Sequence, residues 1–314
     1  MLFSNEADTL IEIENLVNQV IKNEQEQTNR RKTHVGDGLG LICEKLMFFM
    51  EQYLSVFQPD YEYSEHLEAF WSGCKVAGLV DHTTGQIMGL GSNWPSSEQV
   101  GAVVTEIIRI VSSKQFKRQV VDRRYQANEK NRHLQDYAAA LHLHYSRLLV
   151  VRVDWYYRQA IQSSVGISDV YRHLDAMIQN VTDRTGIFTN LVGYAWCIEQ
   201  GTSRGYHLHT VFYFPGSDHQ SDWYMAQQIG ELWEVVTQGM GTPHNCNTPA
   251  EKEKYDRLGI LGVGMIHRKD KSACANAVKA VGYLANPEKE DQYLRAKPSG
   301  RRAFATGQLP KARE

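Results

Sequence analysis

The chain has 314 residues, of which 42% are hydrophobic and 22% charged, and its formal net charge is −2 at pH 7. This length predicts two domains, and the composition is typical of a soluble globular protein. No apolar run approaches the ~18–20 residues of a membrane span, and the acidic start lacks the basic and apolar parts of a signal peptide. Five scattered cysteines without a CxxC pair are typical of reduced thiols. We therefore expect a cytoplasmic protein with no membrane partner.

Helical patterns dominate up to about residue 135. In the segment LICEKLMFFMEQYLSVF, four apolar residues recur near helical spacing: Leu41, Leu46, Phe49 and Tyr53. Residues 103–143 predict two further helices. We expect residues 1–135 to form a helical N-terminal domain that either binds DNA or mediates self-association.

The last of these predicted helices is rich in basic residues. Between Arg109 and Arg132, eight Lys or Arg residues stand against two acidic residues. Such a run is usually a solvated helix face, and contact with nucleic-acid phosphates is the other interpretation. Under the second interpretation, the candidate DNA-binding residues are Lys117, Arg118, Arg123 and Arg124.

Strand patterns begin at Ser146. Seven segments follow in the order strand, helix, strand, strand, helix, strand, helix: residues 146–158, 168–183, 189–201, 206–216, 221–239, 261–270 and 271–286. Ser168 is the predicted N-cap of the first helix, and a short link that contains glycine joins the two central strands into a hairpin. This order predicts an α+β fold with a ferredoxin-like, split βαβ antiparallel sheet and helices packed on one face.

We assign this sheet to residues 136–300 and a basic C-terminal tail to residues 301–314. From residue 295 onward, six Lys or Arg residues stand against one acid. Arg301 and Arg302 are therefore further candidates for contact with DNA.

The triplet His-Leu-His occurs twice, at His142–His144 and at His207–His209. The first lies in an Ala-rich helical pattern, where residues i and i+2 are about 200° apart and cannot easily hold one ion. The second lies in a predicted strand, where residues i and i+2 share a face. His207 and His209 are thus a candidate metal-binding pair on the open face of the sheet, and a satisfied pair without metal is the alternative.

Neighbouring residues extend this candidate site. Glu199 lies on the preceding strand and would complete a set of two histidines and one carboxylate, which suits Mg²⁺ or Mn²⁺, although the sequence leaves the hairpin register open. Tyr283 and Lys279 share one face of a later helix, and a phenol with an ordinary pKa near ~10 needs such a cation to act as a nucleophile. Arg204, beside Gly205, could hold a phosphate. Each residue also has an ordinary structural interpretation, as a strand-end acid, a packed tyrosine or a solvated arginine.

The His-x-His strand, the hairpin and the later tyrosine together resemble the HUH endonuclease superfamily. More narrowly, the chain resembles the inovirus-type (filamentous phage) rolling-circle replication initiator family over about residues 109–307. The matching segments are HYSRLLVVRVDWYYR, RGYHLHTVFYFPGS, IGELWEVVTQGMGTPHNCN, GVGMIHR and GYLANPEKEDQYLRAKPSGRRAFATG. The resemblance implies a nickase whose tyrosine attacks one DNA strand, forms a 5′-phosphotyrosine and frees a 3′-OH that primes synthesis.

The resemblance also implies roles for single residues. It implies that His207 and His209 bind a divalent metal, that Glu199 is the third ligand, and that Tyr283 is the nucleophile. The family pattern has a lysine three residues after the tyrosine, where this chain has Asn286. Lys279, Lys289 or Lys297 could replace that lysine, and Tyr293 is an alternative nucleophile.

Three other functions remain open at this point. The departure at Asn286 favours a sequence-specific DNA-binding regulator on the same fold with weak or no nicking activity. A transposase or conjugative relaxase would use the same type of site, but relaxases usually carry three histidines, and the strand of His207 offers no third.

The expected partners are single-stranded origin DNA and a duplex recognition site. The sequence lacks a GxxxxGK[ST] motif, so any helicase that is needed would come from the host.

Overall fold

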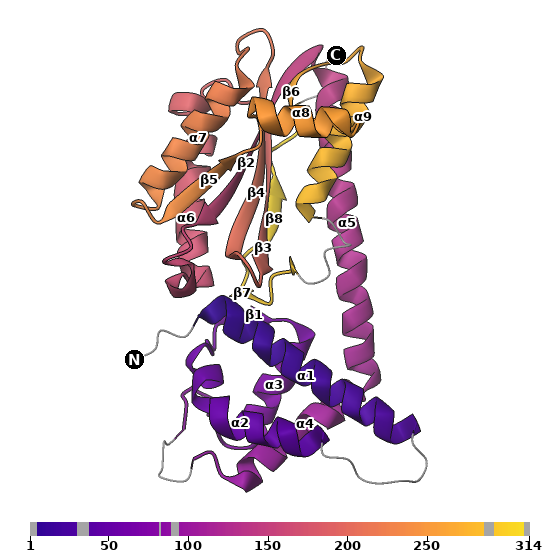
Figure 1. Ribbon diagram of the computed structural model, residues 1–314, viewed down its shortest axis with the longest axis vertical. Helices are drawn as coiled ribbons and strands as arrows, with labels where there is room; N and C mark the ends of the chain where they lie inside the picture. The colour runs from indigo at the N-terminus through magenta and orange to yellow at the C-terminus, as the bar shows by residue number, and fades with distance from the viewer. Residues whose placement is uncertain (1–4, 30–37, 82, 89–93, 286–291, 311–314) are drawn as a thin grey trace. The chain divides into compact units, whose positions relative to one another are not determined.

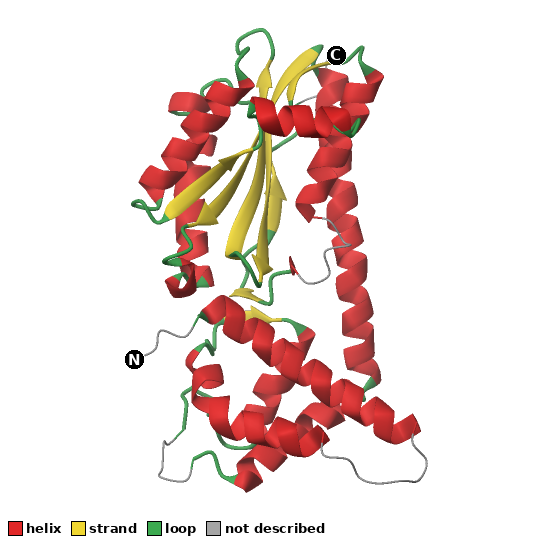
Figure 2. Ribbon diagram, viewed as in Figure 1, coloured by secondary structure: helices red, strands yellow, loops and turns green. Residues whose placement is uncertain are grey.

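The structure is a computed structural model that describes residues 5–29, 38–81, 83–88, 94–285 and 292–310. The chain divides into two compact units, one formed by Met1–Arg123 with Arg295–Arg301 and the other by Arg124–Leu294 with Arg302–Glu314. The boundary falls within the long helix α5 (Lys114–His144). A helical N-terminal region thus precedes an antiparallel sheet with interleaved helices (Figure 2), which confirms the predicted α+β class. No helix in the described ranges has both the length and the apolar character needed to cross a bilayer.

Four helices build the first unit around one hydrophobic core: α1 (Glu6–Asn29), α2 (Gly38–Ser55), α3 (Glu65–Val76) and α4 (Ser97–Val111). The same unit holds a pair of short antiparallel strands, β1 (Tyr61–Tyr63) and β7 (Ala296–Pro298). In α2, Ile42, Leu46 and Met50 are buried, whereas Leu41 is 65% exposed. The buried face of α2 therefore begins at Ile42 rather than at Leu41.

Buried ion pairs hold this first unit together. Arg123 of α5 contacts Glu65 of α3, with 2.8 Å between Nε and Oε1. Burial alone would raise the pKa of Glu65, but hydrogen bonds from His66 and Arg123 lower it to about 2. Arg295 pairs in the same way with the buried Glu14 of α1. Breaking such a pair leaves a charge without a partner in a dry environment, which is strongly destabilising.

Six strands form the sheet of the second unit: β2 (Arg147–Tyr157), β3 (Gly193–Gly201), β4 (Gly205–Pro215), β5 (Gly241–Asn245), β6 (Gly264–His267) and β8 (Phe304–Thr306). Their order is β5-β2-β4-β3-β8, and β6 pairs with the segment of β2 that β5 does not reach. All of these pairings are antiparallel. The two central strands, β2 and β4, are buried along most of their length.

Four further helices belong to the second unit: α6 (Ile167–Thr182), α7 (Asp222–Val236), α8 (Pro249–Arg257) and α9 (Lys271–Gly282). Helices cover both faces of the sheet, with α6 and α7 on one side and α5 and α9 on the other (Figure 1). Trp233 of α7 stacks on Trp155 of β2, with ring centroids 5.0 Å apart. The prediction of helices on one face is therefore wrong. β2 and β4 carry apolar side chains on both faces, and each face must be covered to keep them from water.

Several short elements and element ends differ from the prediction. Helix α6 has Gly166 rather than Ser168 as its N-cap, and α7 ends at Val236, before Gly239. The patterns did not predict β5, β8 or α8. Strand β5 contains Pro243, which is unfavourable inside a sheet and is tolerated here at the sheet edge. Three short 3₁₀ turns also lie within the described residues: η1 (Gln162–Ser164), η2 (Gly186–Phe188) and η3 (Tyr283–Ala285).

Candidate metal centre

The β3–β4 hairpin brings Glu199 beside the second His-Leu-His triplet. Its register pairs Glu199 with His207 and Cys197 with His209. Residues directly opposite each other in antiparallel strands point to the same face, so Glu199 shares a face with both histidines. Strand β4 starts at Gly205, whose φ of +56° favours glycine and allows the tight turn that sets this register. The structure thus supplies the register that the sequence leaves open.

The three predicted ligands converge on one buried point. Glu199 Oε2 lies 3.3 Å from His207 Nε2 and 3.1 Å from His209 Nε2. One ligand atom from each residue lies within 4.8 Å of the other two, and all three side chains are buried. The predicted open face is therefore wrong, because His207 and His209 are each only 5% exposed. This group could bind a metal ion.

The second nitrogen of each imidazole faces an oxygen acceptor. His209 Nδ1 lies 3.0 Å from Asp154 Oδ2, and His207 Nδ1 lies 3.2 Å from the carbonyl oxygen of Gly205. The carbonyl oxygen of Gly205 assigns the proton of His207 to Nδ1, so that the Nε2 lone pair of this ring faces Glu199. Metal-bound histidines commonly have this arrangement, since the outer acceptor fixes the tautomer and the orientation of the ring. The donor set therefore fits a cation held among the three residues.

Asp154 also faces the centre, although the sequence did not predict it. It lies on β2 directly opposite His209, and Arg152 holds its carboxylate with contacts of 3.2 Å to both oxygens. Burial alone would raise the pKa of Asp154, but Arg152 and His209 keep it well below its ordinary value. In the segment VRVDWYY, Arg152 and Asp154 share one face of a buried strand, and the residues that alternate with them on the other face are apolar. This pair of charged residues in a buried strand is the sequence signal that could have revealed Asp154.

The centre favours positive charge. Burial alone would lower the pKa of His209, but the Asp154 and Glu199 carboxylates raise it above its ordinary value. The imidazole therefore lies between one carboxylate from each neighbouring strand, Asp154 on β2 and Glu199 on β3. Either a proton or a metal ion would satisfy this surplus of negative charge.

Arg204 contacts the ring of Tyr156, which in turn stacks on His207 of the centre. Its guanidinium carbon lies 4.6 Å from the ring centroid of Tyr156, and the Tyr156 ring stacks on His207 with centroids 5.6 Å apart. Arg204 is exposed, so its charge remains accessible to a substrate. Tyr156 was not among the site residues that the sequence predicted.

Tyr283 lies on the face of the sheet that carries the centre. It follows α9 directly, its N–H donates to the carbonyl oxygen of Lys279, and its side chain is 52% exposed. Leu284, the next residue, is buried in one cluster with Ala195 and Cys197 of β3. Cys197 is opposite His209 in the hairpin register. Lys279 is exposed, as a residue acting on substrate would need to be.

The other predicted residues are spread over the molecule. Of the four predicted DNA-binding residues on α5, three are exposed: Lys117, Arg118 and Arg124. Arg118 lies 3.7 Å from Asp122, and Arg123 pairs with Glu65. Tyr293 is half-buried, Arg301 belongs to the first unit, and Arg302 is exposed. Asn286 and Lys289 lie outside the described residues.

The first His-Leu-His triplet lies in α5, as predicted, and its imidazoles do not converge. His142 is buried with its ring 6.2 Å from that of Tyr213, and burial lowers its pKa to about 4. His144 is half-exposed and contacts the ring of Tyr145. Among the residues that the structure describes, only Glu199, His207 and His209 form a group of three or more potential metal ligands.

The family model for the YagK/YfjJ C-terminal domain matches residues 113–289. This segment includes the three converging ligands, Asp154, Lys279 and Tyr283. No curated protein and no solved structure matches the chain significantly. Since the matched segment is more than half of the chain, the protein belongs to the YagK/YfjJ C-terminal domain family.

Proposed function

We propose that the protein is a metal-dependent single-strand DNA endonuclease and strand transferase that initiates rolling-circle replication. The resemblance to HUH endonucleases and inovirus-type initiators motivates this proposal. The observation that supports it best is the convergence of Glu199, His207 and His209 on the sheet face that also packs against the helix before Tyr283. An enzyme that attacks a phosphodiester needs such a cation site and a nucleophile that substrate can reach.

The proposed metal is Mg²⁺ or Mn²⁺, held by Glu199, His207 and His209. When bound, such an ion would polarise a phosphate oxygen and offset the negative charge that develops at the attacked phosphorus. Asp154 would orient His209, and the carbonyl oxygen of Gly205 would orient His207. Arg204 is accessible for an ionic contact with a neighbouring phosphate of the DNA.

Tyr283 is the proposed nucleophile. Its phenol oxygen forms a bond to phosphorus and releases its proton to solvent, while the bond between phosphorus and the 3′ oxygen breaks. The 3′ oxygen takes up a proton and becomes the free 3′-OH that primes synthesis. The exposed Lys279, one helical turn earlier, is the second proposed catalytic residue. The phosphotyrosine ester preserves the phosphodiester energy for later rejoining.

A denaturing gel with labelled single-stranded origin oligonucleotides in Mn²⁺ or Mg²⁺ tests this proposal. We expect the wild type to form a covalent adduct that is absent in Tyr283→Phe, while the variant still binds the oligonucleotide. Tyr293→Phe is the matched control and should keep the adduct. An adduct that persists in Tyr283→Phe and disappears in Tyr293→Phe would move the nucleophile to Tyr293. Cleavage that EDTA leaves intact would contradict the metal-dependent mechanism.

A DNA-binding regulator with weak or no nicking is the second candidate. It is favoured by Asn286, which stands where the inovirus-type pattern has a lysine. Tight and sequence-specific binding by the wild type, with neither cleavage nor adduct, would support this function. Under that outcome, Asn286→Lys is the substitution that should restore cleavage.

A further inference from the structure

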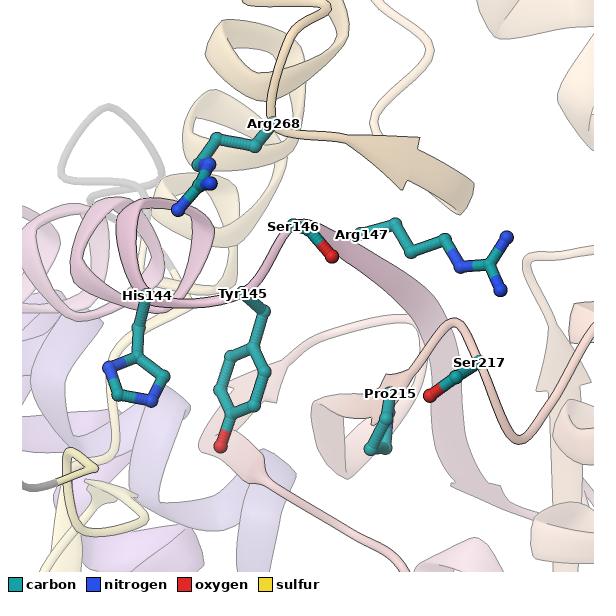
Figure 3. Close-up of a pocket in the computed structure, with 7 residues that line it drawn as sticks. All are labelled: His144, Tyr145, Ser146, Arg147, Pro215, Ser217 and Arg268. Atoms are coloured by element: carbon teal, nitrogen blue, oxygen red, sulfur yellow. The ribbon is translucent and has the colours of Figure 1, made fainter. Parts of the chain in front are cut away.

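A pocket of about 290 Å³ opens where α5 ends and β2 begins (Figure 3). Its lining includes Tyr145 and Arg147 at this junction, Ser217 after β4, and Arg268 after β6. Arg147 is the first residue of β2, whereas Asp154 lies about seven residues further along, which at ~3.3 Å per residue is about 23 Å away. The pocket therefore lies at the end of the sheet opposite to the metal centre, and none of its residues takes part in that centre.

Two arginines give this pocket a positive charge. Neither Arg147 nor Arg268 forms an ion pair within the described part of the chain. Arg268 uses Nη1 to donate a hydrogen bond of 2.9 Å to the carbonyl oxygen of Leu143, at the end of α5. A guanidinium carries five N–H donors, so most of its hydrogen-bonding capacity remains available. Unpaired guanidinium groups in a concave site favour an anionic ligand, and phosphate above all.

Gly216 helps to place Arg147. A Cβ at Gly216 would lie 2.8 Å from Arg147 Cγ and 2.6 Å from Met265 Sδ, closer than real side chains approach. The Gly216 N–H also donates to the carbonyl oxygen of Arg147, at 3.2 Å. The chain after β4 therefore passes directly over the stem of the arginine, which limits the positions that its guanidinium can take.

The two cations do not converge on one point. In Figure 3, the side chains of Arg147 and Arg268 extend in opposite directions, and the ring of Tyr145 extends in a third direction. A single small anion would contact only one of them. A ligand with a flat ring and a phosphate on each side would contact all three residues, and one nucleotide within a strand has this form.

We propose that this pocket binds one nucleotide unit of single-stranded DNA, with its base against Tyr145 and its flanking phosphates at Arg147 and Arg268. The proposed nickase function supplies the type of nucleic acid, and the pocket itself supplies the location. Strand β2 connects the pocket to the metal centre, so the pocket would hold a stretch of the strand about 23 Å from the site of cleavage.

Fluorescence anisotropy with a labelled oligothymidylate tests this assignment. The titrations contain EDTA, so that metal at Glu199, His207 and His209 does not contribute. Arg147→Gln should weaken binding about fivefold to tenfold and should reduce the salt slope by about one. Lys269→Gln is the matched control, because Lys269 is exposed, lies next to Arg268 and does not line the pocket. The control should retain more of the affinity and show a steeper salt slope than Arg147→Gln.

Tyr145 distinguishes a nucleotide from a simple anion. Tyr145→Leu should weaken oligothymidylate binding about tenfold, whereas Tyr145→Phe should bind like the wild type, because stacking needs the ring and not the hydroxyl. Thermal unfolding of both variants checks that the fold is retained. Competition with thymidine monophosphate and with inorganic phosphate separates the sources: a strand should compete far better than either. Equal competition by inorganic phosphate would overturn the nucleotide assignment.

The outcomes separate this inference from the proposed function. Equal effects of Arg147→Gln and Lys269→Gln, together with an intact covalent adduct, would overturn the pocket and leave the nickase standing. A selective loss of binding in Arg147→Gln and Tyr145→Leu, in a protein that forms no adduct, would support the pocket and argue against the nickase.

Discussion

The two His-Leu-His triplets have the same sequence and different surroundings. On α5, His142 enters the apolar core beside Tyr213, and among the described residues no group forms a hydrogen bond with its Nε2. On β4, His207 and His209 share a face and lie within 3.3 Å of the same carboxylate oxygen. The difference follows from the backbone period, since i and i+2 diverge on a helix and coincide on a strand. A short motif therefore predicts a metal site only when its secondary structure is known.

The neighbours reinforce this difference. Burial lowers the pKa of His142 to about 4, so this ring stays neutral at pH 7. His209 is just as buried, yet Asp154 and Glu199 raise its pKa. In the first triplet, burial disfavours the protonated form of His142. In the second triplet, the neighbouring carboxylates favour a positive charge on His209.

Removal of a ligand should produce the largest effect. We expect His209→Ala to weaken Mn²⁺ binding about 100-fold or more, since changes to outer-shell partners alone cost about 10–100-fold. His142→Ala changes the same residue type in the other triplet and should leave Mn²⁺ affinity unchanged. Isothermal titration calorimetry measures both, and equal affinities for the two variants would argue against the centre.

The outer carboxylate should have the next largest effect. Asp154→Asn removes the charge that faces His209 Nδ1 and should weaken Mn²⁺ binding by about 10–100-fold, while Glu199, His207 and His209 remain in place. The substitution leaves the charge of Arg152 without its ionic partner, which could destabilise the sheet. Circular dichroism checks that the variant remains folded. Unchanged affinity in a folded variant would show that Asp154 serves only to neutralise Arg152.

The buried imidazole of the first triplet should make the protein sensitive to acid. The pKa of His142 is about 4 in the folded state, against an ordinary value of 6.5, so the unfolded state binds more protons between these values. Stability should therefore fall as the pH falls from 6.5 to 4, by about 3 kcal/mol at the lower end. His142→Phe keeps a ring beside Tyr213 and should remove this part of the pH dependence. Urea unfolding across this pH range measures it, and identical pH profiles for variant and wild type would contradict the assignment.

A designed change should give the smallest effect and test the role of spacing directly. Ala140→His places a second imidazole one turn before His144, where residues i and i+4 share a helix face. We expect weak Ni²⁺ binding that the wild-type helix lacks and that is far weaker than at a site with three ligands. His209→Ala in the same chain isolates the new site from the old one. No gain in Ni²⁺ affinity would show that spacing alone is insufficient.

The sequence predicted most of the long elements of the second unit and the shared strand face of His207 and His209. The pattern of β4 placed His207 and His209 on one face because strands alternate with a period of two. The faces that helices cover were harder to predict, since burial of both sides of β4 depends on α5 and α9, which are far away in the chain. Asp154 and Tyr156 were missed for the same reason. Their relation to the histidines depends on the pairing of β2 with β4, and strand pairing leaves little trace in a single sequence.

The position of His209 between two strands has a consequence for the order of folding. Glu199 is close to it in the chain and joins it when the hairpin closes, within about 1–10 μs for an ordinary hairpin. Asp154 arrives only when β2 pairs with β4, a contact of long sequence separation that forms more slowly. In refolding followed by stopped flow, metal should therefore bind loosely at first and tighten once the sheet is complete. The rise in metal affinity during refolding would thus mark the pairing of the central strands β2 and β4.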